Sequence, residues 1–367
     1  MDFSFSDDQE ALRGGVHTVL DTECDVDALR AFELADEDAR AELSANRWTI
    51  LAELGAPAVV VPASSNGLGL TDVDLVGILE EGGFACLPEP LLETAALAAP
   101  TLSALLPEPA AAAGLKALVE EDAMFAVGGI EVTAGGIASP SEVSADGTLR
   151  TPHVVGARDA AILLLACRDD ESGWQLHAVP SASCTAEPTP ALSATRDVSI
   201  VHWPLASDTL LAYGVAAEAA ISLLADRAAA ATAALLVGLA DRMLSMAASY
   251  AKERHQFGKP IGSFQAVKHH LANARVALEF ARPATYRAAW SLATAQPSLS
   301  HDASMAKAMT SDAAELAARV ALQVHGAIGY TWECDLHFFM KRTWALSRAW
   351  GDAATHRRLV LTHRAKR

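Results

Sequence analysis

The order of three sequence textures constrains the fold of this chain more than any single motif does. Residues 1 to about 120 carry apolar residues at helical spacing, as in "DARAELSANRWTILAELG" and "DVDLVGILEEGG". From about 121 to 208, short apolar runs such as "DAAILLLACR" and "VSIVHWPL" lie between Gly, Pro, Asp and Ser, which is typical of β-strands. Helical spacing then returns and continues to the C-terminus. We therefore predict helices, then a small β-domain, then a helical bundle.

The second helical zone is built mainly on alanine. Hydrophobic residues make up 51% of the chain but aromatic residues only 6%, and residues 215–253 form one long alanine-rich pattern. Because Ala has the highest helix propensity and a small side chain, this composition favours long helices that pack closely. The longest apolar run, Ala228 to Ala240, is shorter than the roughly 20 residues that span a bilayer, so we predict a buried helix there.

Charge and cysteine usage exclude several classes of protein. A formal charge of −17 argues against binding to nucleic acid or to an anionic membrane surface, which both need a basic footprint. Five scattered cysteines without a C-x-x-C motif indicate reduced thiols, and neither they nor the histidines have metal-ligand spacing. The acidic N-terminus lacks the pattern of a signal peptide. We expect a cytoplasmic protein without a bound metal.

The first candidate site is the stretch "YAKERHQFGKPIGSFQAVKHHLANAR", residues 250–275. One predicted helix ends near "KERHQFG", and a second begins at "SFQAVKHH" after a turn stiffened by Gly and Pro. Arg254 can direct two N–H groups at a phosphate, Phe257 offers a flat apolar face to a ring, and Gln265 can bond a cofactor edge. The alternative interpretation of this stretch is a surface arginine beside a helix turn, without a ligand.

The second candidate site is "QVHGAIGYTWECDLHFFMKRTW", residues 323–344. Gly326 and Gly329 allow a backbone to approach another group closely, and Gln323 lies one helical turn earlier. A helix C-terminus that ends on glycine is the alternative. The chain has no G-x-G-x-x-G, P-loop or G-x-S-x-G motif, so neither a nucleotide fold of those kinds nor a serine hydrolase is indicated.

Together with "LAELGAPAVVVPASSNGLGLTDVDLVGILEE", these two stretches resemble the acyl-CoA dehydrogenase superfamily over nearly the whole chain. The R-x-x-F-G-x-P-I-x-x-x-Q pattern is the specific part of the likeness. The resemblance implies an α+β fold with an N-terminal helical domain, a central small β-sandwich or barrel domain and a C-terminal four-helix bundle. The corresponding ranges are 1–120, 121–208 and 209–367, and the bundle would contact the cofactor and oligomerise.

The resemblance also implies an activity and a set of cofactor contacts. Such enzymes use FAD to oxidise the Cα–Cβ bond of an acyl-CoA thioester: a carboxylate removes the α-proton while a hydride passes from the β-carbon to the flavin. An electron-transfer-flavoprotein type of acceptor belongs to this chemistry. Arg254, Gln256 and Phe257 would touch the FAD of a neighbouring subunit. Its adenosine diphosphate end would be held by Gln323, Gly326 and Ala327, the last of which stands where the family usually has a second glycine. Gln265 is the remaining predicted cofactor contact.

The chain departs from the family pattern where a catalytic base should stand. Counting 27 residues from Gln323 leads to Trp350, at the position of a C-terminal Glu in many members. The other family position for the base is Ala228, and Ala229 replaces the arginine that follows it. The neighbouring Asp226-Arg227 pair would face about 200° away on a helix. The flavin-covering motif of the β-domain is reduced to "GGIEVTAGG".

These losses lead to the hypothesis of a non-catalytic subunit in a heteromeric α2β2 acyl-CoA dehydrogenase, with a partner that supplies the base and acyl pocket. The chain resembles actinobacterial heteromeric dehydrogenases that act on CoA thioesters of steroid side chains. One alternative is a self-sufficient homotetramer whose base is Asp352 or, less naturally, Glu333. A second alternative is a structural scaffold that binds no flavin.

Overall fold

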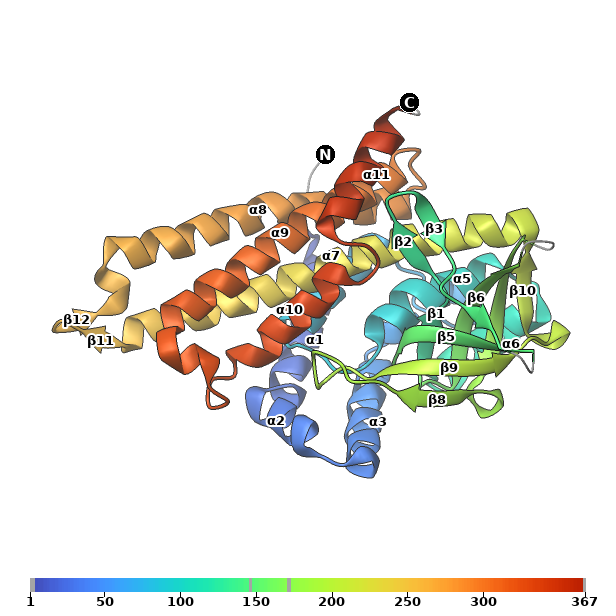
Figure 1. Cartoon of the computed structure of the whole chain (residues 1–367), viewed down its shortest axis with the longest axis horizontal. Coiled ribbons are helices and arrows are strands. Elements are labelled where there is room, and N and C mark those ends of the chain that lie inside the picture. The colour runs from blue at the N-terminus through green and yellow to red at the C-terminus, as the bar shows by residue number, and fades with distance from the viewer. Residues whose placement is uncertain (1–3, 145–146, 170–172, 366–367) are drawn as a thin grey trace. The chain divides into compact units, whose positions relative to one another are not determined.

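The computed structural model describes residues 4–144, 147–169 and 173–365 of the chain (Figure 1). Its contacts divide the chain into two compact units, which are described separately below. Unit 1 comprises residues 1–30, 76–87 and 229–367, and unit 2 comprises residues 31–75 and 88–228. The three predicted domain ranges stay a prediction, although the predicted order of helices, strands and helices is confirmed.

The N-terminal zone is helical, as predicted. Ser6 and Gln9 form a reciprocal capping box that starts the first helix, and Asp36 caps the third through the N–H of Ala39. A π-helical segment, Leu92–Ala98, precedes the last two helices. The helices are α1 (Asp7–Glu23), α2 (Val26–Leu34), α3 (Glu37–Glu53), α4 (Asp72–Phe84), α5 (Ala99–Ala104) and α6 (Pro109–Glu120).

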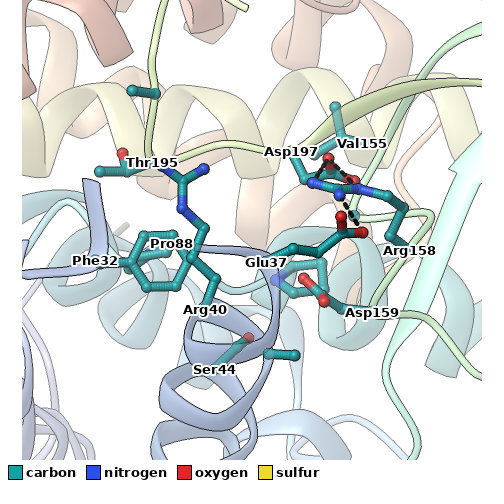
Figure 2. Close-up of a pocket in the computed structure, with 14 residues that line it drawn as sticks. Phe32, Glu37, Arg40, Ser44, Pro88, Val155, Arg158, Asp159, Thr195 and Asp197 are labelled. Carbon is teal, nitrogen blue, oxygen red and sulfur yellow. Dashed lines mark hydrogen bonds and ion pairs between the residues drawn. The ribbon is translucent and has the colours of Figure 1, made fainter. Parts of the chain in front are cut away.

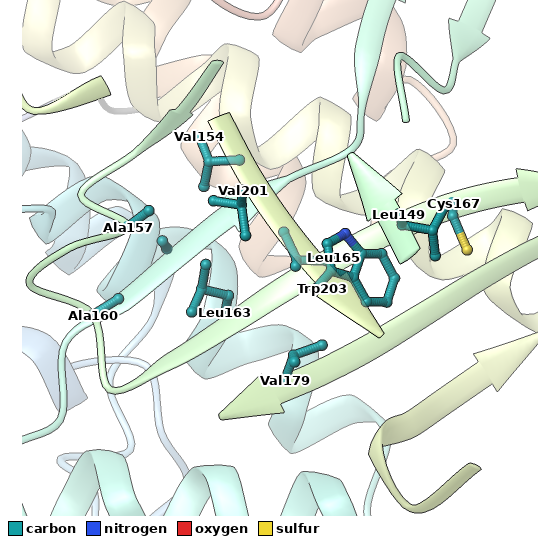
Figure 3. Close-up of a cluster of buried hydrophobic side chains, with 11 residues drawn as sticks. Leu149, Val154, Ala157, Ala160, Leu163, Leu165, Cys167, Val179, Val201 and Trp203 are labelled. Carbon is teal, nitrogen blue, oxygen red and sulfur yellow. The ribbon is translucent and has the colours of Figure 1, made fainter. Parts of the chain in front are cut away.

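The β-domain lies within unit 2 and contains two four-stranded sheets, ordered β1-β6-β7-β10 and β4-β5-β9-β8, beside the hairpin β2–β3. Its buried apolar side chains surround Trp203, whose Nε1–H donates to Thr151 at 2.9 Å (Figure 3). The strands are β1 (Phe125–Gly128), β2 (Glu131–Thr133), β3 (Gly136–Ala138), β4 (Glu142–Val143), β5 (Thr148–Val155), β6 (Ile162–Asp169), β7 (Gly173–Pro180), β8 (Thr185–Pro188), β9 (Val198–Pro204) and β10 (Leu210–Tyr213).

The C-terminal zone is a bundle of long helices. Small side chains let these helices approach closely, because Ala229 and Ala233 of α7 pack against Ala288 of α8 and against Ala303 and Ala306 of α9. The helices are α7 (Gly214–Glu253), α8 (Gln265–Ala293), α9 (Leu299–His325), α10 (Leu336–Arg348) and α11 (Ala353–Ala365).

Helix α7 has the length and composition of a membrane span, but 72% of its most apolar 18-residue window is buried inside the protein. The predicted buried run from Ala228 to Ala240 lies within it and is buried throughout. The prediction of a core helix is therefore confirmed.

Within unit 1, α4 crosses α7 at two glycines. A Cβ on Gly83 would stand 2.1 Å from the Leu235 carbonyl oxygen, and a Cβ on Gly238 would stand 1.9 Å from the Glu80 carbonyl oxygen. Real Cβ atoms do not approach oxygen so closely, so both positions require glycine for space. The two backbones are therefore in direct contact.

Candidate cofactor-contacting site

The first predicted motif folds into a tight hairpin between two helices of unit 1. Helix α7 ends at Glu253, and the two-residue strands β11 (His255–Gln256) and β12 (Lys259–Pro260) pair across the turn that follows. The turn residues Phe257 and Gly258 have φ of 52° and 77°, as a two-residue hairpin turn of the primed type requires. Arg254 is fixed at the base of the hairpin, since its carbonyl oxygen accepts from the N–H of Ile261 at 2.8 Å.

The side chains of this hairpin point to solvent. Phe257 is 91% exposed, and its ring forms a T-shaped pair with the Phe264 ring at 6.1 Å between centroids. Arg254, Gln256 and Gln265 are also exposed. Helix α8 begins at Gln265 without a side-chain cap, so no side chain occupies the N–H groups of its first turn. An exposed aromatic face, a guanidinium and a helix N-terminus therefore lie together.

The second predicted motif forms the end of α9 and a 3₁₀ segment, Gly326–Tyr330. Gln323 is exposed on the last turn of α9, and Ala327 is exposed one residue beyond Gly326. Gly326 has φ 64° and ψ −138°, a backbone conformation that is largely restricted to glycine. A Cβ there would meet no atom within 4 Å, so glycine is needed for the conformation and leaves open space above the backbone.

An aromatic contact brings the two motifs to the same end of unit 1. The ring of Tyr250, one turn before Arg254, stacks on the ring of His325 at 4.6 Å between centroids. In Figure 1 this end carries β11, β12, the start of α8 and the end of α9. Residues 252–268 hold four Lys or Arg and one Glu in a chain whose formal charge is −17. The end is thus locally basic and suits a phosphate-bearing ligand.

Sequence comparison decides the family. The C-terminal domain model of acyl-CoA dehydrogenases matches residues 218–363. The chain is 31% identical to acyl-CoA dehydrogenase IpdE2 of Mycolicibacterium smegmatis over 344 residues, which is 92% of each protein. The chain belongs to the acyl-CoA dehydrogenase family. Acyl-CoA dehydrogenases are oxidoreductases that act on CH–CH bonds and bind FAD.

One further relative and two solved structures are also similar to the chain. The chain is 33% identical to acyl-CoA dehydrogenase FadE34 of Mycobacterium tuberculosis over 336 residues, which is 91% of the chain but only 44% of FadE34. The ChsE4-ChsE5 complex of Mycobacterium tuberculosis contains a chain that superposes with a TM-score of 0.86 at 22% identity, covering 100% of both. A steroid acyl-CoA dehydrogenase, Tcur3481-Tcur3483, gives 0.83 at 24% identity over 98% of each chain. The acyl-CoA dehydrogenase fold is thereby confirmed.

The two positions predicted for the catalytic base differ in their surroundings. Ala228 is fully buried on α7, and Ala229 belongs to the alanine core between α7, α8 and α9. The preceding Arg227 makes two hydrogen bonds to the carboxylate of Asp72, at 2.6 and 3.3 Å. That arginine is engaged in a structural ion pair.

Trp350 lies in the turn between α10 and α11, which side chains from two helices hold. Trp350 has φ 57°, a conformation that costs a non-glycine residue about 1–2 kcal/mol. The fully buried Lys307 of α9 donates to the carbonyl oxygens of Ser347 at 3.2 Å and Gly351 at 3.0 Å. His356 of α11 lies 2.8 Å from the Trp350 oxygen through Nε2, which donates. Three carbonyls of the turn therefore have donors.

Burial changes the protonation of both donors. Burial lowers the pKa of Lys307 to about 7, although the nearby Asp352 carboxylate acts to raise it. Burial also lowers the pKa of His356 to about 4, although the hydrogen bond to the Trp350 carbonyl acts to raise it. His356 is therefore neutral at neutral pH, with its proton on Nε2.

Asp352 and Glu333, the alternative candidates for the catalytic base, make other contacts in the fold. Asp352 caps α11 by accepting from the N–H of Thr355 at 2.7 Å, and that hydrogen bond holds the pKa of its carboxyl below the usual range. Glu333 is exposed, and a hydrogen bond from Thr331 lowers its pKa. The "GGIEVTAGG" stretch forms the end of β1 and the hairpin β2–β3, in which Thr133 donates to the Gly136 oxygen at 2.8 Å.

Unit 2 contains a cavity of about 120 Å³, and its lining includes none of the predicted cofactor-contacting or base residues (Figure 2). Arg158 lines it and pairs with Glu37 at 2.6 Å and with Asp197 at 2.8 Å. Burial and the neighbouring Asp197 raise the pKa of Asp159 beside them. The sequence gives no signal for this cavity, because its lining comes from α2, α3 and three loops that lie far apart along the chain.

Proposed function

We propose that this chain is the non-catalytic subunit of a heteromeric α2β2 acyl-CoA dehydrogenase and that it contributes to the FAD site of a catalytic partner. One contrast carries the proposal. The predicted cofactor contacts gather at one exposed end of unit 1, whereas the two base positions hold a buried alanine and a tryptophan in a braced turn. A chain that has the cofactor contacts but no catalytic base can contribute to an FAD site whose base and substrate belong to another subunit.

The exposed end fits the chemistry of FAD. Arg254 and the uncapped start of α8 would hold the diphosphate, because a guanidinium and free helix N–H groups both favour an anion. The open backbone at Gly326 and Ala327 would receive the adenosine end, with Gln323 beside it. Phe257 would present its face to the ring system. FAD supplies the hydride acceptor for oxidation of the Cα–Cβ bond.

The relatives support a two-subunit arrangement and suggest a substrate. FadE34 is about twice as long as its match to this chain, which leaves room for a second dehydrogenase-sized half. The ChsE4-ChsE5 structure is a complex, and Tcur3481-Tcur3483 is a steroid acyl-CoA dehydrogenase. On this basis we extend the proposal to a complex that desaturates a steroid side-chain CoA thioester. Its cytoplasmic location stays a prediction from the sequence.

The structure weakens the alternative of a self-sufficient homotetramer. The carboxylate of Asp352 caps α11 and has a lowered pKa, so it is a poor acceptor for the α-proton at neutral pH. A scaffold without flavin is the other alternative, and it predicts that the exposed end has no effect on flavin retention.

A comparison of the chain expressed alone with the chain co-expressed with a catalytic partner tests the proposal. The partner to use is an acyl-CoA dehydrogenase encoded by a neighbouring gene that retains a Glu at one of the two base positions. We expect the isolated chain to purify without flavin and without activity, and the co-expressed pair to hold two FAD per α2β2 and to oxidise an acyl-CoA. A yellow isolated chain whose flavin is reduced by an acyl-CoA would refute the heteromer.

Restoring a carboxylate at the C-terminal base position should not create an active site. We expect Trp350→Glu to leave the isolated chain inactive, because Ala229 still stands where the family has an arginine and the flavin-covering motif is still absent. The measurement is flavin reduction by acyl-CoA in the presence of added FAD, with the catalytic partner as positive control. Substantial turnover by this single variant would show that the site is intact apart from its base.

A further inference from the structure

Helix α10 presents aromatic and basic side chains on its outer face. Nine of its residues are buried, and those that reach solvent fall on one stripe that includes Lys341, Trp344 and Arg348, at spacings of three and four residues. Trp344 is 37% exposed at the centre of this stripe. The outer face of an amphipathic helix is mainly polar, and here a partly exposed indole lies between two cations.

The stripe continues onto the segment that precedes α10. The Nζ of Lys341 lies 4.2 Å from the centroid of the Trp332 ring, and the His337 ring meets the edge of the same indole at 4.9 Å. Trp332 is 68% exposed although two side chains hold it in place. Trp332, Lys341, Trp344 and Arg348 therefore form a preorganised surface in which aromatic and cationic groups alternate, here called the aromatic–basic stripe.

The stripe carries two cations on an acidic protein. Lys341 is partly exposed and Arg348 is exposed, in a chain whose formal charge is −17. These cations favour an acidic partner through electrostatic complementarity. Trp and Arg are also the residues most enriched at the energetic centres of protein interfaces.

The position of the stripe identifies its occupant. Gln323, Gly326 and Ala327 are the contacts proposed above for the partner's flavin, and they end where the stripe begins. Trp332 follows Ala327 by five residues, at the end of the same exposed segment. The stripe is thus adjacent along the chain to the residues proposed to contact the partner's flavin, which makes the partner subunit its best-supported occupant.

We propose that the aromatic–basic stripe docks an acidic surface of the catalytic partner subunit; this inference rests on the proposed function. The two indoles supply the apolar contact, and Lys341 and Arg348 supply electrostatic attraction that salt screens. The stripe is thus the protein–protein part of an interface whose flavin part is formed by the preceding residues.

The test compares the affinity of the purified subunits for each other at about 50 and 500 mM NaCl, with wild-type chain and with Lys341→Glu/Arg348→Glu. We expect the double variant to bind at least about tenfold more weakly at low salt and to lose most of the salt dependence of the wild type. Trp344→Ala should weaken binding at both salt concentrations alike. Lys116→Glu, an exposed charge reversal on α6, is the matched control and should bind as the wild type does.

Three outcomes would overturn the proposal, and they have different meanings. If both stripe variants bind the partner as tightly as the wild type while Arg254→Ala still releases flavin, the docking surface is wrong and the proposed function stands. If the isolated wild-type chain self-associates in sedimentation velocity and the double variant does not, the occupant is a second copy. If the wild-type chain forms no complex with the partner, the proposed function fails together with this inference.

Discussion

Arg254→Ala should cause the heteromeric complex to lose its FAD. Arg254 is exposed at the base of the β11–β12 hairpin, beside the uncapped start of α8. Loss of a charge-assisted contact to a phosphate costs about 1.5–3 kcal/mol, so we expect FAD to bind roughly tenfold to a hundredfold more weakly. The measurement is flavin content after gel filtration, followed by titration of the apo-complex with FAD.

Two control variants separate this contact from a general charge effect. Lys252→Ala removes an exposed positive charge two residues earlier and should retain flavin as the wild type does. Arg254→Lys keeps the charge but loses the fork of two N–H groups, so its affinity should lie between the two. Full flavin retention by Arg254→Ala would instead favour the scaffold without a cofactor role.

Lys307→Met should change how stability depends on pH. The pKa of Lys307 is about 7 in the folded chain because of burial, against 10.5 for a solvated lysine. Above pH 7 the unfolded chain therefore binds a proton that the folded chain has released, so the free energy of unfolding rises with pH. The contribution approaches a tenfold change in the folding equilibrium per pH unit. In Lys307→Met that rise should be absent.

Urea unfolding at pH 7, 8 and 9 measures this difference. The range ends at pH 9 because burial raises the pKa of Cys167 and Cys184 to about 11, from 9.0 for an exposed thiol. Above pH 9 the unfolded chain therefore releases thiol protons that the folded chain keeps, and stability falls as pH rises. Lys268→Met, an exposed lysine on α8, is the matched control and should keep the slope of the wild type. An unchanged slope in Lys307→Met would mean that the Lys307 amine stays charged in the fold.

Local patterns in the sequence predict most of the fold. The alanine-rich stretch becomes α7, and the runs "DAAILLLACR" and "VSIVHWPL" become β6 and β9, because helix propensity and apolar runs are properties of neighbouring residues. Strand β5 is not predicted by its sequence pattern. Its alternation is broken at Pro152 and at His153, which has φ 58°, where the pairing with β9 shifts register.

The candidate site is predictable in its parts but not in its assembly. The motifs around Arg254 and Gly326 are visible in the sequence, whereas the stacking of Tyr250 on His325 that joins them depends on how two helices pack. Lys307 likewise gives no sequence signal, since its partners Ser347 and Gly351 lie 40 and 44 residues away. Tertiary packing determines such long-range contacts, and spacing along the chain carries no trace of them.

The glycine crossing of α4 and α7 has a mechanical consequence. Gly83 fits against the Leu235 carbonyl, and Gly238 fits against the Glu80 carbonyl, so each backbone is notched into the other at two points. A shift of α7 by one residue, about 1.5 Å, would bring Val237 or Leu239 in place of Gly238 and direct a side chain at the Glu80 carbonyl oxygen. These two helices therefore resist sliding along each other at this crossing, and we expect the contact between them to be retained when a partner binds.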